Sequence, residues 1–120
     1  MTQGIDFVPL DNYFGIKGSA KVLEINKCFY SITLTQSNLA KDDNKFFIIQ
    51  AVQVGDPPTD QYYLFTRWGR VGMPGQTSMS EAPLDRNEVI RQYHVKTQAK
   101  VNRGGYKVIE VNYEQGPIEE

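Results

Sequence analysis

The sequence predicts an α+β fold in which one α-helix packs across a mainly antiparallel β-sheet. Between residues 21 and 81, apolar and polar residues alternate in several short segments, which is the period of strands with one buried face. Prolines and glycines separate these segments as turns, and a single helical pattern follows them. At 120 residues the chain is long enough for one such core and too short for two. We therefore expect one domain at residues 21–113, an N-terminal arm at residues 1–20 and an acidic tail at residues 114–120.

The first two strands are expected within residues 21–54. One face of the first strand collects Cys28, Tyr30, Ile32 and Leu34, and the other face collects Ser31, Thr33 and Thr35. A polar turn at residues 36–44 leads to a second, more apolar strand at residues 46–54. Residues 55–60 are expected to form an exposed loop, because their two prolines cannot donate to a ladder. Cys28 is the only cysteine, so it cannot form a disulfide within the chain, and we expect a small buried side chain in a reducing compartment.

A third strand, a tight turn, a short strand, a helix and a closing strand complete the expected fold. Residues 62–70 continue the alternation, Pro74 and Gly75 favour a type II turn, and residues 76–81 are expected to pair back. Asp85, followed three residues later by Glu88, resembles a capping box at a helix start. The helix is expected to last to about residue 101, to end at the Gly104-Gly105 pair, and to bury Val89, Ile90, Tyr93 and Val101. Residues 106–113 form the expected last strand.

Charge and composition exclude several functional classes. The net charge is −1, but residues 1–16 and 110–120 hold six acids and no base, so residues 17–109 carry about +5, which is adequate for a few phosphate contacts. Residues 1–16 lack the pattern of a signal peptide, and no apolar run is long enough to span a membrane. One His and one Cys argue against a structural zinc site. His94 has no adjacent nucleophile and no hydrolase, zinc-protease or P-loop motif is present, so we expect no catalysis, no cofactor and no metal.

The most specific motif is Arg67-Trp68-Gly69-Arg70-Val71-Gly72, followed by Pro74-Gly75-Gln76. It resembles the signature of the WGR domain, which is named for its Trp-Gly-Arg triplet and is found beside the catalytic domain of DNA-dependent poly(ADP-ribose) polymerases. Residues 34–39 and 44–50 resemble the family's upstream motifs, and Lys96-Thr97, Tyr106-Lys107 and residues 110–113 resemble its downstream ones. The resemblance covers roughly residues 22–113. The sequence departs from better-known members in the proline-bearing loop at residues 56–60 and in a short glycine-rich region after Lys100, where several members carry a further Trp.

The resemblance implies that Trp68 stacks on a nucleobase or sugar at a DNA end. A strand-end indole next to two glycines is suited to such stacking, which contributes ~1–3 kcal/mol per base. The alternative is a core or corner-packing tryptophan. Arg70 lies two residues on, so a regular strand places it on the same face, where it could bind a phosphate. Its alternative is a solvated strand residue, which is also what we expect of Arg67 on the opposite face.

Four further positions are implied to contact DNA. Asn44 and Lys45 close the polar turn, where backbone N–H groups and a lysine can meet an anion, and they resemble the positions that hold the terminal 5′ phosphate. Gln36 resembles a second polar contact, and Tyr113 resembles a residue that supports the DNA end from the closing strand. Turn capping for Gln36 and core packing for Tyr113 remain alternatives. The acids at positions 42 and 43 would repel phosphate.

The helix carries a row of basic residues that has two interpretations. It contains Arg86, Arg91, Lys96 and Lys100 with only Glu88 opposing them, and Arg103 and Lys107 follow. These residues form either a second phosphate-facing surface or the solvated face of an amphipathic helix.

The sequence therefore supports a nuclear DNA-binding module for strand breaks or ends with a 5′ phosphate, belonging to or associated with a poly(ADP-ribose) polymerase. The NAD-using catalytic domain and the helical domain of such a polymerase are its possible protein partners, and the chain is then a fragment, which the acidic tail favours, or a stand-alone WGR protein. The alternative is a protein–protein interaction module in a DNA-repair or chromatin complex, with weak DNA binding, which the near-neutral net charge supports. A third hypothesis, single-stranded RNA binding, lacks the aromatic strand motif that would recommend it.

Overall fold

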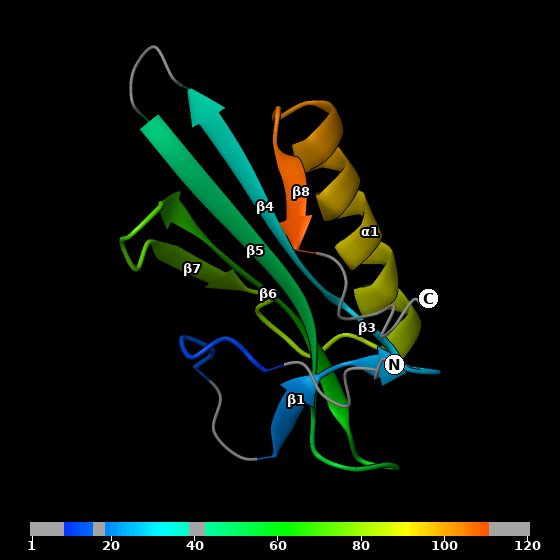
Figure 1. Cartoon of the computed structure of the whole chain (residues 1–120). Coiled ribbons are helices and arrows are strands. Elements are labelled where there is room, and N and C mark those ends of the chain that lie inside the picture. The colour runs from blue at the N-terminus through cyan, green and yellow to red at the C-terminus, as the bar shows by residue number, and fades with distance from the viewer. Residues whose placement is uncertain (1–8, 16–18, 39–42, 111–120) are drawn as a thin grey trace, which may run out of the picture.

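The computed structural model describes residues 9–15, 19–38 and 43–110, and it shows a sheet with one helix on one face (Figure 1). Its elements are β1 (Ala20–Val22), β2 (Glu24–Ile25), β3 (Cys28–Phe29), β4 (Ser31–Asn38), β5 (Asp43–Val54), β6 (Gln61–Arg70), β7 (Gln76–Met79), α1 (Arg86–Asn102) and β8 (Lys107–Glu110). The main sheet has the order β7-β6-β5-β4-β8, with β1 paired to β5, and β2 and β3 form a separate hairpin. Every described strand pair is antiparallel. The predicted α+β fold is confirmed.

The sheet is built around β5, the longest of the described strands. One edge of β5 pairs with β4 over residues 43–50 and with β1 over residues 52–54, and the other edge pairs with β6 over residues 45–54. Because successive side chains of a strand point to opposite faces, Phe47, Ile49 and Ala51 share the face covered by α1. We call this the helix face, and we call the opposite face the arm face, because residues of the N-terminal arm lie on it.

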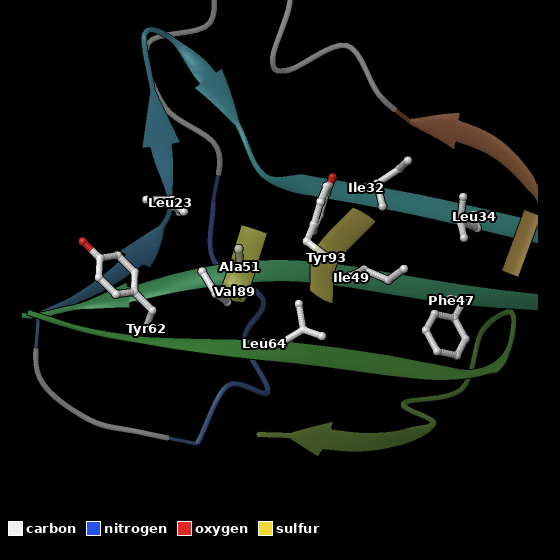
Figure 2. Close-up of a cluster of buried hydrophobic side chains, with 10 residues drawn as sticks. All are labelled: Leu23, Ile32, Leu34, Phe47, Ile49, Ala51, Tyr62, Leu64, Val89 and Tyr93. Carbon is white, nitrogen blue, oxygen red and sulfur yellow. The ribbon is translucent and has the colours of Figure 1, made fainter. Parts of the chain in front are cut away.

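The hydrophobic core lies between the helix face and α1 (Figure 2). Its buried members come from the three strands β4, β5 and β6, the segment between β1 and β2, and the helix; they are Leu23, Ile32, Leu34, Phe47, Ile49, Ala51, Tyr62, Leu64, Val89 and Tyr93. Val89 and Tyr93 are buried as predicted for α1, and Ile90 and Val101 pack partly buried against the same cluster. The buried face of α1 is therefore the face that its apolar pattern predicts.

Local hydrogen bonds fix the start of α1. The Asp85 side chain accepts a hydrogen bond from the backbone N–H of Glu88 at 2.8 Å, which confirms the Asp85 half of the predicted capping box; the Glu88 side chain bonds other residues. The Glu88 carboxylate in turn accepts hydrogen bonds from Arg91, at 3.0 and 2.6 Å, and from Gln92, at 2.8 Å. These bonds, chiefly those from Arg91, lower the pKa of Glu88 to about 2.

Glu88 is expected to titrate far below an ordinary glutamate. In an NMR titration its side-chain carboxyl shift should change with a midpoint near pH 2, and Arg91→Gln should raise the midpoint toward 4.5. The folded-state pKa lies below the unfolded value, so the contribution of this carboxylate to stability is complete above pH 4.5 and is lost as the pH falls toward 2. The same midpoint in wild type and Arg91→Gln would contradict the assigned cause.

Residues 9–15 of the N-terminal arm pack on the arm face of the sheet. The Phe14 ring meets the Phe65 ring edge-on, with centroids 5.6 Å apart, and Leu10 joins a second small apolar cluster. Asp11 forms an ion pair with Arg67, whose Nε lies 3.1 and 3.0 Å from the two carboxylate oxygens. This part of the arm is therefore tied to the same strand that carries Trp68.

The expectation of a solvated Arg67 is wrong, although its side chain does lie on the face opposite Trp68. The side chain is only 17% exposed, and besides Asp11 it donates a hydrogen bond to the Pro74 carbonyl oxygen at 2.7 Å. Its guanidinium carbon also lies 4.6 Å from the centroid of the Tyr13 ring and 5.0 Å from that of Phe46. The sequence pattern did not indicate this burial, because Asp11 lies 56 residues before Arg67.

The expectation that Cys28 is buried is also wrong, because its side chain is exposed. Asn26 and Lys27 both adopt positive φ, at 52° and 66°, and make the tight turn of the β2–β3 hairpin. This hairpin is a separate sheet, so the alternation of β4 does not extend back to Cys28. Its neighbour Phe29 is buried instead.

Candidate nucleic-acid interface

The sheet register brings three of the predicted site residues together. Gln36 of β4 is paired with Lys45 of β5, and Lys45 is paired with Arg70 of β6. We call these three residues the polar row. Two positions further along the same three strands, Leu34, Phe47 and Trp68 are paired in the same way. These three residues form the next row on the helix face. Lys45, Arg70 and Trp68 therefore share one face at one end of the sheet, as predicted for Arg70 and Trp68.

Trp68 is half-buried at the margin of the core. Its ring stacks on Phe47, with centroids 5.6 Å apart and an interplanar angle of 16°. It also packs against the buried cluster without belonging to it. Corner packing, the alternative considered for Trp68, thus describes its contact with Phe47, while the residue as a whole stays partly exposed.

Lys100, in the last turn of α1, and Tyr106, which follows the helix, both contact the Phe47 ring. The Lys100 ammonium lies 4.5 Å from the Phe47 ring centroid, and Tyr106 meets the same ring edge-on at 5.9 Å. Gln36 donates a hydrogen bond from Nε2 to the carbonyl oxygen of Gly104. Lys100 therefore adds a positive charge beside the stacked rings, and Gln36 links the polar row to the end of the helix.

Two glycines hold the turn after Trp68 close to the strand. A Cβ built on Gly75 would lie 2.8 Å from the carbonyl carbon of Trp68 and closer still to its oxygen, and Gly75 has a φ of +78°. A Cβ on Gly69 would lie 2.8 Å from the Gly75 Cα. Because no side chain fits between these backbones, glycine at both positions allows β6 and the turn to approach each other closely. The hydrogen bond from Arg67 to Pro74 fixes the same turn from the arm face.

Two predicted residues are not placed with the polar row. Asn44 is exposed and lies next to Lys45 on β5, so alternation directs its side chain to the other face. Its backbone carbonyl oxygen accepts a hydrogen bond from the N–H of Val71 at 2.9 Å. Tyr113 lies outside the described residues.

The basic residues of α1 do not form one uniform surface. Arg91 is paired with Glu88 at 2.6 Å, Lys100 lies against Phe47, and Lys96 forms no ion pair within the described ranges.

Among the residues that the structure describes, no three potential metal ligands come together. No helix in those ranges is long and apolar enough to cross a membrane.

The sequence of this sheet and helix matches a known family. The model of the WGR domain family matches residues 30–112, a stretch that contains β4 to β8, both rows and α1. This chain belongs to the WGR domain family. The motif that carries the predicted resemblance is thus part of a match over most of the chain.

Poly(ADP-ribose) polymerases are among the relatives that share this WGR domain. Poly [ADP-ribose] polymerase 2 of Zea mays is 32% identical over 72% of this chain and 13% of its own length. The Arabidopsis thaliana protein of the same name is 37% identical over 58% of this chain and 10% of its own length. Human protein mono-ADP-ribosyltransferase PARP3 is 34% identical over 71% of this chain and 17% of its own length. The chain spans less than a fifth of the length of each of these relatives.

Proposed function

We propose that this WGR domain is a non-catalytic module that binds DNA strand breaks or ends carrying a 5′ phosphate. It acts in the nucleus as a regulatory part of, or partner to, a poly(ADP-ribose) polymerase. The observation that carries the proposal is the register of Lys45 with Arg70, directly beside the Trp68–Phe47 stack. The names of the relatives support the link to ADP-ribosylation.

The two rows match the two features that distinguish a DNA end from continuous duplex. An end presents an unstacked base or sugar surface on which the partly exposed Trp68 indole can stack. Such stacking contributes about 1–3 kcal/mol to the binding free energy. It also presents a terminal phosphate, which Arg70 can bind bidentately and Lys45 can bind as a point charge. Lys100, held on Phe47, adds a further positive charge at the same place. Gln36 supplies a neutral side chain beside them.

Fluorescence anisotropy with three DNA probes tests this function. The probes are a nicked duplex with a 5′ phosphate, the same nick with a 5′ hydroxyl, and an intact circle. Arg70→Gln and Lys45→Gln should each weaken binding to the phosphorylated nick by about tenfold, the size expected for losing a phosphate contact. Lys21→Gln, the same change of charge at an exposed position of β1, is the matched control and should leave binding unchanged.

Trp68 needs two variants because it also packs on Phe47. Trp68→Leu keeps an apolar side chain against the core but removes the stacking surface, whereas Trp68→Ala removes both. Thermal unfolding identifies any loss of fold, and Trp68→Leu should weaken nick binding while remaining folded.

The salt dependence of nick binding counts the phosphate contacts. With about two to three such contacts, a plot of the logarithm of the binding constant against the logarithm of the salt concentration should have a slope near −0.9 per contact. Equal, weak binding of wild type to all three probes would overturn the proposed function.

A further inference from the structure

A concave surface lies away from the two rows, between α1 and β6. It has a volume of about 250 Å³ and is lined by Leu64, Arg91, Gln92, Val95, Lys96 and Ala99. We call it the helix groove. None of its lining residues belongs to the polar row or to the row of Phe47 and Trp68, so a ligand in the helix groove does not need the proposed DNA site.

The helix groove has an apolar interior that the residues described by the structure leave uncovered. Leu64 and Ala99 line it, and Val95 is 53% exposed although it is a branched apolar residue on a helix. A single exposed valine is common on protein surfaces, but here it borders a concavity with apolar walls. The volume lies below the roughly 300–1,000 Å³ of typical small-molecule sites. It suits one or two large side chains of a peptide better than a whole cofactor.

The rim of the helix groove is positively charged. Arg91 and Lys96 border it, and Lys96 forms no ion pair with any residue in the described part of the chain. The nearby acid, Glu88, already accepts hydrogen bonds from Arg91 and Gln92. One Glu88 charge against Arg91 and Lys96 leaves a net positive rim, which complements carboxylates and repels basic segments.

We propose that the helix groove docks an acidic segment of a protein partner. One large apolar side chain of that segment enters between Leu64 and Val95, and flanking Asp or Glu side chains face Lys96 and Arg91. An apolar anchor in a pocket surrounded by complementary charges is a common arrangement of binding hot spots. The groove thus gives this WGR domain a protein-binding surface that is separate from its proposed DNA site.

Peptide display on the folded chain tests this proposal. A random 12-residue library is selected on wild type and counterselected on Val95→Glu, which fills the entrance of the groove with a negative charge at an exposed position. Enriched peptides should be net acidic and contain Leu, Phe or Met. Their affinity should fall about tenfold or more in Val95→Glu and in Lys96→Glu. Gln98→Glu, at an exposed position of α1 outside the groove, is the matched control and should bind as wild type does.

Each other outcome overturns the proposal. Failure to enrich peptides that prefer wild type, enrichment of basic peptides, or equal loss in Gln98→Glu would show that the groove does not select acidic segments. Binding of the phosphorylated nick is measured on the same Val95→Glu protein and should be unchanged. If Val95→Glu abolishes nick binding while circular dichroism shows a folded helix, the groove is part of a DNA surface instead.

Discussion

Gly75→Ala is expected to lower the free energy of unfolding by about 2–4 kcal/mol. The new Cβ would overlap the Trp68 carbonyl group, which is backbone and cannot rotate away. It would also impose a side chain at a φ of +78°, where an L-residue is strained by about 1–2 kcal/mol. Relief of the overlap has to move either β6 or the turn. Urea unfolding of the two proteins measures the difference.

Gly72→Ala is the matched control for this prediction. Gly72 also has a positive φ, at +94°, but a Cβ there would have no atom within 4 Å. It therefore carries the conformational strain without the overlap, and it should be destabilised by only about 1–2 kcal/mol. Equal destabilisation by the two alanines would show that the close approach of Gly75 to Trp68 does not limit the turn. If the proposed function holds, Gly75→Ala should also weaken nick binding more than Gly72→Ala.

The second large effect is expected from Asp11→Asn. The variant keeps the shape of the side chain but leaves the guanidinium of Arg67 without its carboxylate. Breaking a fully buried ion pair costs about 3–5 kcal/mol, and the 17% exposure of Arg67 reduces the expected loss to about 2–3 kcal/mol. Asp56→Asn in the exposed loop is the control and should change stability by less than about 0.5 kcal/mol.

A double-mutant cycle with Arg67→Met isolates the ion pair. If Asp11 and Arg67 act together, Asp11→Asn should cost little in the Arg67→Met background, because the unpaired guanidinium is then absent. Additive losses in the double variant would show that the two residues stabilise the protein independently. Because Arg67 also hydrogen-bonds Pro74, Arg67→Met alone should cost more than Asp11→Asn alone.

Local sequence signals predicted most of the fold because their causes lie within a few residues. The Asp85 cap involves the backbone of Glu88, three positions away, and the buried positions Val89 and Tyr93 follow the helical period. The positions of β5, β6 and the loop between them likewise follow from period two and from two prolines. The family motif then indicated which end of the sheet carries the candidate site.

Interactions between distant segments were not predictable in the same way. The burial of Arg67 depends on Asp11 in the arm, and the position of Lys100 depends on how α1 crosses β5. The exposure of Cys28 depends on where a hairpin separates from the main sheet. The opposite directions of Asn44 and Lys45 were within reach of the sequence, because neighbours on a strand alternate, but the motif grouped them together.

The polar row has a width that follows from sheet geometry alone. Gln36, Lys45 and Arg70 lie on three adjacent strands, so the row spans two inter-strand spacings, or roughly 10 Å. Continuous duplex carries a charge every ~1.7 Å along its axis, and a row this narrow cannot follow it for a helical turn. Under the proposed function, lengthening the DNA therefore adds no further contacts. The amount of this protein that binds to a DNA sample would therefore scale with the number of DNA ends in the sample. It would not depend on the total mass of DNA.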